Sequence, residues 1–137
     1  KAFMKKATQS STADYIRDKR GHPRAEIAID GVSEGSSEME QTSITKRENN
    51  PWWRVNLGEV TDINSITIYN CTDTYKEMLQ NFTVEVWDAG GNVVWSSDQQ
   101  NYPDPMLKLS TGGVKGQYVN IKINGRAYLA LGEVIVQ

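Results

Sequence analysis

The stretch Asn50-Pro51-Trp52-Trp53-Arg54-Val55-Asn56-Leu57-Gly58 decides the fold. Trp53, Val55 and Leu57 share one phase of a period-two pattern, and the residues between them share the other. This alternation predicts a β-strand with one buried face and a second face that is partly covered. Pro51 suits the first position of such a strand, because a proline inside it would remove a backbone donor.

The same period of two recurs along the chain, over residues 66–69, 82–87 and 119–123. Ala89-Gly90-Gly91-Asn92 predicts a tight hairpin, and Thr111-Gly112-Gly113 and Asn124-Gly125 predict later turns. The polar segment from Asp30 to Asn50 has no strong period and predicts a long loop of the kind that often carries function. We therefore expect an all-β fold, a jelly-roll β-sandwich of about eight antiparallel strands.

Length and composition exclude several classes of protein. The 137 residues fit one domain, 1–137, and a formal net charge of −2 gives no bulk attraction for nucleic acid. No run of about twenty apolar residues predicts a transmembrane segment. The single Cys71 and the single His22 exclude an internal disulfide and a zinc cluster of usual spacing, and as a catalytic pair they lack a third, orienting group. Acids such as Asp73 and Glu77 lack an identified cleft. We expect a binding module and no enzyme.

Four blocks in register resemble the fucolectin-type (F-type) lectins and related discoidin-like domains of the galactose-binding-like fold. They are Ala7-Thr8-Gln9-Ser10-Ser11, Ala28-Ile29-Asp30-Gly31, Asn50-Pro51-Trp52-Trp53-Arg54-Val55 and Leu131-Gly132-Glu133-Val134. Microbial members of this group include family 47 of the carbohydrate-binding modules, which are usually appended to secreted glycan-degrading enzymes. Because the chain starts at Lys1 without a signal-peptide pattern, we expect a module excised from a larger secreted protein.

The resemblance also implies a structural Ca²⁺. Leu129, Leu131 and Glu133 share a strand phase, so a carboxylate occupies a position where the pattern expects an apolar side chain. A cation would remove the cost of burying it. Asp30 offers a second carboxylate, and the remaining ligands of the family fall on Ile27, Val32, Gln41 and Thr42. The alternative is that Glu133 lies past a bulge in solvent and that Asp30 only holds a turn.

The chain departs from the family at the neutral-sugar site. The histidine and two arginines that hold fucose in the family fall at Ile44, Cys71 and Met78, which cannot donate comparable hydrogen bonds. Asp73 keeps the acidic position between the two arginines, but it cannot specify fucose alone. The usual mechanism for terminal fucose is therefore not expected.

Basic loops replace that triad. The segment Arg17 to Arg24 carries four cations, one acid and the only histidine, and its bounding Gly and Pro predict a loop. In the resembling fold this loop lies at the same end as Lys46, Arg47 and the Thr72 to Met78 loop. Arginine pairs well with sulfate or carboxylate, so we expect an anionic polysaccharide, in the sharpest form a sulfated fucan. The expected ligand-binding residues are Lys19, Arg20, His22, Arg24, Lys46, Arg47, Asp73, Tyr75, Lys76 and Arg126.

Three alternatives stay open. The basic residues are solvated loop charges in the plainest interpretation. A neutral fucose- or galactose-binding lectin domain is the second, and a discoidin-type adhesion domain that binds a protein or a membrane surface is the third. Trp52 is expected to serve in packing, and Trp87 and Trp95 are expected to contact each other across the Gly90-Gly91 hairpin.

Overall fold

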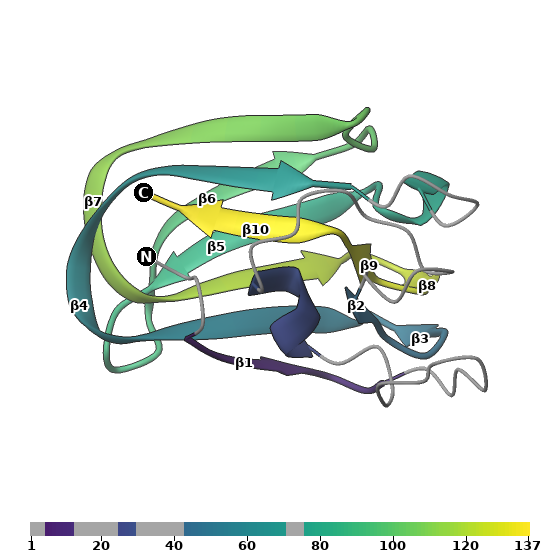
Figure 1. Ribbon diagram of the computed structural model, residues 1–137, viewed down its shortest axis with the longest axis horizontal. Helices are drawn as coiled ribbons and strands as arrows, with labels where there is room; N and C mark the ends of the chain where they lie inside the picture. The colour runs from purple at the N-terminus through teal and green to yellow at the C-terminus, as the bar shows by residue number, and fades with distance from the viewer. Residues whose placement is uncertain (1–4, 13–24, 30–42, 71–75) are drawn as a thin grey trace.

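Two long strands build the sandwich by passing through both of its layers (Figure 1). The computed structural model describes residues 5–12, 25–29, 43–70 and 76–137. In it β4 (Trp52–Tyr69) and β7 (Met106–Ile123) pair antiparallel, from Trp52 opposite Lys122 to Tyr69 opposite Met106. Register shifts interrupt this ladder after Asn56 and after Ile63, where both ribbons turn from one layer into the other.

The remaining strands extend these two layers. The first layer has the order β1-β4-β7-β5-β6, with β1 (Lys6–Gln9), β5 (Phe82–Trp87) and β6 (Val93–Gln99). In the second layer, β10 (Glu133–Val136) pairs with the far half of β4. This arrangement, with antiparallel pairing throughout the described strands, confirms the predicted all-β jelly-roll sandwich.

The decisive stretch folds as its pattern predicts. Trp53, Val55 and Leu57 are buried in the core, whereas Trp52, Arg54 and Asn56 are half-buried on the opposite face of the strand. The indole nitrogen of Trp53 donates a hydrogen bond of 2.9 Å to the carbonyl oxygen of Ala25. This bond ties β4 to the short 3-10 helix η1 (Ala25–Ile29), which covers one side of the core.

The predicted turn at Thr111-Gly112-Gly113 is wrong. These residues lie inside β7, at the bend that carries the strand from one layer to the other. Gly112 and Gly113 have φ angles of 70° and 79°, which side chains disfavour, so the glycine pair permits a bend rather than a chain reversal. The hydroxyl of buried Thr111 donates to the carbonyl oxygen of Ile63 and fixes the bend.

Short elements gather at the end of the sandwich opposite this bend (Figure 1). β2 (Ser43–Ile44) pairs with β9 (Ala130–Leu131), and β3 (Glu48–Asn49) pairs with β8 (Arg126–Ala127). The 3-10 helix η3 (Lys76–Met78) lies near the same end. The predicted loop from Asp30 to Asn50 therefore needs correction over its second half, where backbone pairing forms two strands that are too short to show a period.

Candidate functional site

Exposed cations meet at the end of the sandwich that carries β3 and β8. Lys46 and Arg47 directly precede β3, and Arg126 begins β8. All three side chains are exposed, and the pairing of Asn49 with Arg126 brings the two segments together. The structure thus unites three of the predicted ligand-binding residues. We call Lys46, Arg47 and Arg126 the basic end.

A carboxylate fixes the loop that carries Lys46 and Arg47. The hydroxyl of Ser10 donates a hydrogen bond of 2.7 Å to Oε2 of Glu48, and the hydroxyl of Ser11 donates to the same oxygen. The backbone N–H of Lys46 donates to the Ser11 hydroxyl over 2.9 Å. Because Glu48 is held by both serines, the loop has a defined course from its first residue to its last.

An open pocket of about 320 Å³ lies beside Arg126. Its wall includes the apolar side chains of Met78 and Ala127 and the amides of Asn81 and Asn124. Asn81 Nδ2 donates to the carbonyl oxygen of Asn124 over 2.6 Å, so the two asparagines lock each other in place. Apolar surface beside a few fixed polar groups is the usual composition of a sugar-sized site.

Sequence reasoning missed this pocket wall. Asn81 adopts a φ of 52°, a conformation that asparagine tolerates better than most residues, and this strain marks the start of β5. The sequence signal is a pair of asparagines, with Asn81 directly before one period-two run and Asn124 directly after another. Their proximity depends on the pairing of Phe82 with Ile123, which no local pattern reveals.

The structure describes two of the three positions at which the resemblance places the family's neutral-sugar triad. Ile44 is 1% exposed, and its carbonyl oxygen accepts a hydrogen bond of 3.3 Å from Gln9 Nε2. Met78 is half-buried in the pocket wall. Neither side chain carries a donor for a sugar hydroxyl. Cys71, the third position, lies outside the described residues.

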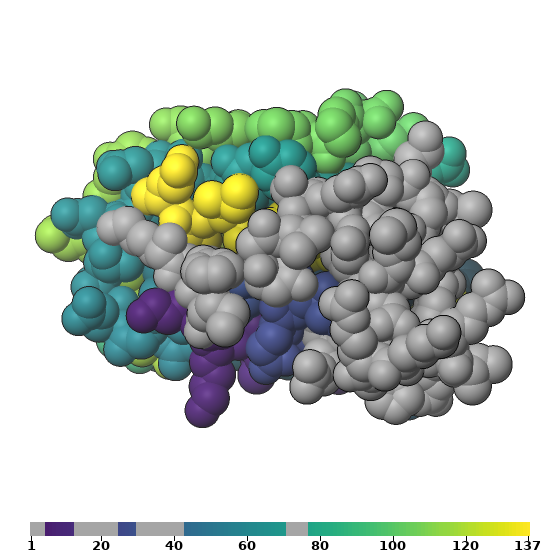
Figure 2. Space-filling view, viewed as in Figure 1, coloured from purple at the N-terminus to yellow at the C-terminus, as the bar shows by residue number. Residues whose placement is uncertain are grey.

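Glu133 is a buried carboxylate among the predicted metal ligands. It is 3% exposed, so the alternative that places it in solvent past a bulge is wrong. Glu133 begins β10, which packs against η1, the element that carries Ile27 and leads directly to Asp30. Figure 2 shows the yellow atoms of β10 above the blue atoms of η1. A buried carboxylate is a candidate ligand for Ca²⁺, which prefers oxygen ligands.

Several predicted site residues lie outside the part of the chain that the structure describes. The part of the chain that the structure describes contains no group of three or more His, Cys, Asp or Glu side chains able to hold a metal. Four predicted metal ligands lie outside it: Asp30, Val32, Gln41 and Thr42. The same is true of six predicted ligand-binding residues: Lys19, Arg20, His22, Arg24, Asp73 and Tyr75. Lys76 begins η3, but its side chain also lies outside the described part.

A second cluster covers the outer face of the first layer. The guanidinium carbon of Arg54 lies 4.4 Å from the ring centre of Trp52 and 4.1 Å from that of Trp87. Desolvation by burial lowers the pKa of Arg54 from its usual value, while Tyr118 and Glu85 oppose that shift. The predicted contact between Trp87 and Trp95 is wrong, because a register shift places Trp87 opposite Val93, and Trp95 packs on the core.

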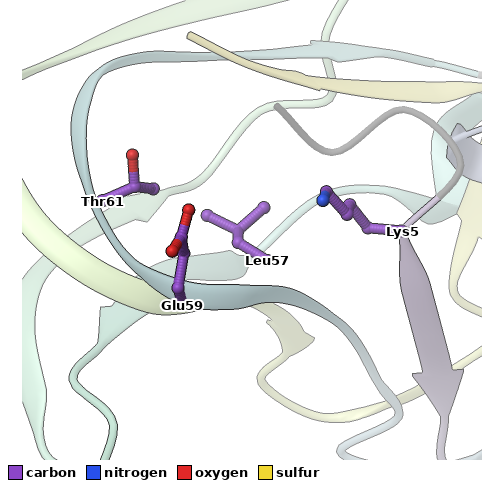
Figure 3. Close-up of a pocket in the computed structure, with 4 residues that line it drawn as sticks. All are labelled: Lys5, Leu57, Glu59 and Thr61. Carbon is purple, nitrogen blue, oxygen red and sulfur yellow. The ribbon is translucent and has the colours of Figure 1, made fainter.

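A smaller pocket of about 240 Å³ lies at the bend of β4 (Figure 3). Lys5, Leu57, Glu59 and Thr61 line it. Lys5 and Glu59 carry opposite charges, and none of these four side chains offers an aromatic ring. The pocket therefore lacks the fixed amides and the excess of positive charge found at the basic end.

No helix in the described part of the chain is long and apolar enough to span a bilayer.

Several known carbohydrate-binding proteins are similar to this chain in sequence and in fold. Fucolectin-5 of Anguilla japonica is 30% identical over 145 residues, covering 98% of this chain and 74% of that protein. The Streptococcus pneumoniae fucose binding module SpX-3 superposes with a TM-score of 0.90 at 28% identity, covering 99% of this chain and 95% of the module. The lectin domain of lectinolysin, solved with Lewis B antigen, gives a TM-score of 0.90 at 25% identity, with coverages of 99% and 94%.

A family profile completes the assignment. The family described as NedA-like, galactose-binding domain matches residues 27–121, which span β4, β5, β6 and most of β7. This range holds the decisive Trp52-Trp53 strand and both bends of the sandwich. The chain therefore belongs to the NedA-like galactose-binding domain family and is a homologue of the fucolectins.

Proposed function

We propose that this chain is a non-catalytic carbohydrate-binding module that holds an anionic, sulfated fucose-containing polysaccharide at its basic end. The observation that carries the proposal is the pairing of β3 with β8, which places exposed Lys46, Arg47 and Arg126 together beside a sugar-sized pocket. Guanidinium groups match the geometry of sulfate with paired donors. The module would be secreted and appended to a glycan-degrading enzyme, as the resemblance to family 47 implies.

The composition of the pocket supports a charged ligand. The fucose triad of the family has no donor at Ile44 or Met78, so hydroxyl groups cannot be held there in the family's way. Arg126 is the cation that lines the pocket, and Glu77 is an acid on the same wall. With Lys46, Arg47 and Glu48 on the neighbouring segment, positive charge exceeds negative charge by one among these five residues (three cations minus two acids). Such an excess attracts a polyanion.

A structural Ca²⁺ belongs to the same proposal. Glu133 would supply a carboxylate and Ile27 a carbonyl oxygen, with Asp30, Val32, Gln41 and Thr42 completing the set implied by the resemblance. The cation would compensate the buried charge of Glu133 and join η1 to β10. Its role is to hold the framework, because the basic end derives its charge from other residues.

The relatives favour one other ligand class. A fucose-binding module and a lectin domain solved with Lewis B antigen share this fold at 28% and 25% identity. A neutral fucosylated glycan is therefore the second candidate. It would need donors other than the family triad, and Asn81 and Asn124 in the pocket wall are such donors.

Affinity electrophoresis tests the two ligand classes directly. The chain is run through gels that contain sulfated fucan, its desulfated form, or a neutral fucosylated glycan, at several salt concentrations. Retardation by the sulfated polymer that fades with salt supports the proposal, because salt screens exposed charges. Retardation by the desulfated and neutral glycans alone would replace it with the neutral-lectin function.

Point variants assign the site. Arg47→Ala and Arg126→Ala are each expected to weaken binding of sulfated fucan about fivefold, since each removes one exposed charged contact of up to about 1 kcal/mol. Lys108→Ala, an exposed cation of β7 in the other layer, is the matched control and is expected to bind like the parent. Parent-like binding by both arginine variants would remove the basic end from the function.

A further inference from the structure

The outer face of the first layer carries an ordered row of aromatic and cationic side chains. The register places Trp52, Lys122 and Thr83 across three adjacent strands, and then Arg54 beside Asn120. A further step along the strands brings Tyr118 beside Trp87, with their ring centres 6.3 Å apart. We call Trp52, Arg54, Trp87, Tyr118 and Lys122 the outer-sheet patch.

Two indole rings and one amide hold Arg54 on the outer face of the sheet. Its guanidinium carbon lies 4.4 Å from the ring centre of Trp52 and 4.1 Å from that of Trp87, so both indoles contact the guanidinium. Nε donates to Asn120 Oδ1 over 3.2 Å, which anchors the inner edge. Within the described residues, this is the hydrogen bond that Arg54 makes, so its Nη edge is available for a planar oxyanion.

Hydrogen bonds and an ion pair hold the acid beside Arg54 within the sheet. Glu85 Oε1 accepts hydrogen bonds of 3.2 Å from both Trp87 Nε1 and Asn120 Nδ2. Its other oxygen lies 3.7 Å from Lys122 Nζ. The Glu85 side chain is only 12% exposed and that of Lys122 is 41% exposed, so the cation is the more exposed partner of this pair. Three half-buried aromatic rings flank that charge.

The patch is continuous with the pocket at the basic end. Asn124, which lines the pocket, donates from Nδ2 to Thr83 Oγ1 over 3.0 Å. Thr83 pairs with Lys122, and Lys122 pairs with Trp52. The pocket wall therefore adjoins the row formed by Thr83, Lys122 and Trp52, and the two rows beyond it extend about 13 Å along the strands.

We propose that the outer-sheet patch is a second contact surface for an anionic polysaccharide, holding the stretch of ligand that extends beyond the basic end. Aromatic rings of Trp52, Trp87 and Tyr118 stack against the apolar faces of sugar rings. The Nη edge of Arg54 pairs with a sulfate or carboxylate on those sugars, and Lys122 adds a second cation. This inference rests on the proposed function, because it extends the ligand assigned to the basic end.

Tryptophan indole signals in ¹H–¹⁵N NMR test the surface without any substitution. The probes are sulfated fucan disaccharide and octasaccharide, the desulfated octasaccharide, and an octasaccharide of galacturonic acid. The sulfated octasaccharide, but not its disaccharide, is expected to shift the Trp52 and Trp87 indole signals while those of Trp53 and Trp95 stay fixed. A comparable response to the galacturonic acid probe would show that a carboxylate serves as well as a sulfate.

The same spectra separate the two proposals. Shifts of the Asn81 and Asn124 amide groups with no shift of the Trp52 and Trp87 indoles would overturn the patch and leave the basic end intact. If none of these signals shifts at a saturating concentration of the sulfated octasaccharide, the proposed function itself is overturned. Shifts of the two asparagine amides and of the Trp52 and Trp87 indoles together support both the proposed function and the outer-sheet patch.

Variants supply the energetic test. Arg54→Lys keeps the charge but loses the planar fork, and it is expected to weaken octasaccharide binding about tenfold, the loss of one charge-assisted hydrogen bond pair. Disaccharide binding is expected to stay within twofold of the parent. If Arg54→Lys weakens binding of the octasaccharide and of the disaccharide equally, Arg54 is a structural residue and the patch is overturned. If the variant binds both oligosaccharides like the parent, the patch is also overturned. Lys108→Ala again serves as the charge control.

Discussion

Trp53→Phe tests how the decisive strand supports the rest of the molecule. Trp53 is fully buried, and its indole N–H donates to the carbonyl oxygen of Ala25 over 2.9 Å. Phenylalanine keeps the apolar face but removes this donor, which leaves a buried carbonyl without that bond at a cost of about 1–3 kcal/mol. The smaller ring also leaves a void worth about 1 kcal/mol. We expect the free energy of unfolding to fall by about 3 kcal/mol.

Urea denaturation and thermal unfolding measure this loss. For a domain of this length, about 3 kcal/mol corresponds to a Tm lower by about 10 °C. Trp52→Phe is the matched control, because Trp52 is the adjacent residue on the half-exposed face, and we expect it to cost less than about 1 kcal/mol. Equal losses for the two variants, or less than about 1 kcal/mol for Trp53→Phe, would refute the role of the Ala25 bond.

Three further outcomes follow from single features. Calcium at a hundredfold excess over its Kd is expected to stabilise the parent by about 2.7 kcal/mol, seen as a Tm that falls on adding EDTA, and Glu133→Gln should abolish that difference. Gly116→Ala places a Cβ 2.3 Å from a valine methyl of β5 and should cost about 1–3 kcal/mol in urea, whereas Gly90→Ala meets atoms at 3.4 Å or more and should be near neutral. The backbone N–H of Asn92 lowers the pKa of Asp88 from 3.8, so its stabilising effect is complete above that pH and is lost as pH falls through the lowered pKa. NMR titration of the Asp88 carboxyl should therefore give a midpoint below 3.8, and a midpoint at or above it would contradict the turn geometry.

Much of the sandwich could be predicted because short local sequence patterns determine its strands and hairpins. The alternation around Trp53 fixes which face of β4 is buried, and the same pattern fixes β5 and the end of β7. The hairpin at Gly90-Gly91 follows from residues that tolerate its backbone, with a φ of 85° at Gly91. Burial of Glu133 does not follow from alternation, because residues 129–134 are all buried and Glu133 shares its phase in β10 with half-buried Ile135.

The remaining features depend on contacts between distant segments. The sequence around Gly112-Gly113 predicts a turn, because two consecutive glycines permit either a turn or a bend within a strand. Only the pairing of β7 with β4 decides between these two geometries. The two-residue strands β2 and β3 are too short to show a period. The cation–π contact of Arg54 with Trp87 joins β4 to β5 across the intervening β7, so no spacing along the chain predicts it.

The exposure of the basic end has a consequence for the size of its ligand. Lys46, Arg47 and Arg126 are all exposed, so each ion pair with a sulfate is screened and contributes at most about 1 kcal/mol. Three such contacts cannot hold a single sugar tightly, whereas a polymer that also reaches the outer-sheet patch adds stacking contacts that salt does not screen. Affinity should therefore rise steeply with the length of the oligosaccharide, and the fraction of binding that survives high salt should rise with it. A monosaccharide that binds as tightly as the polymer would instead require a closed hydroxyl-reading pocket.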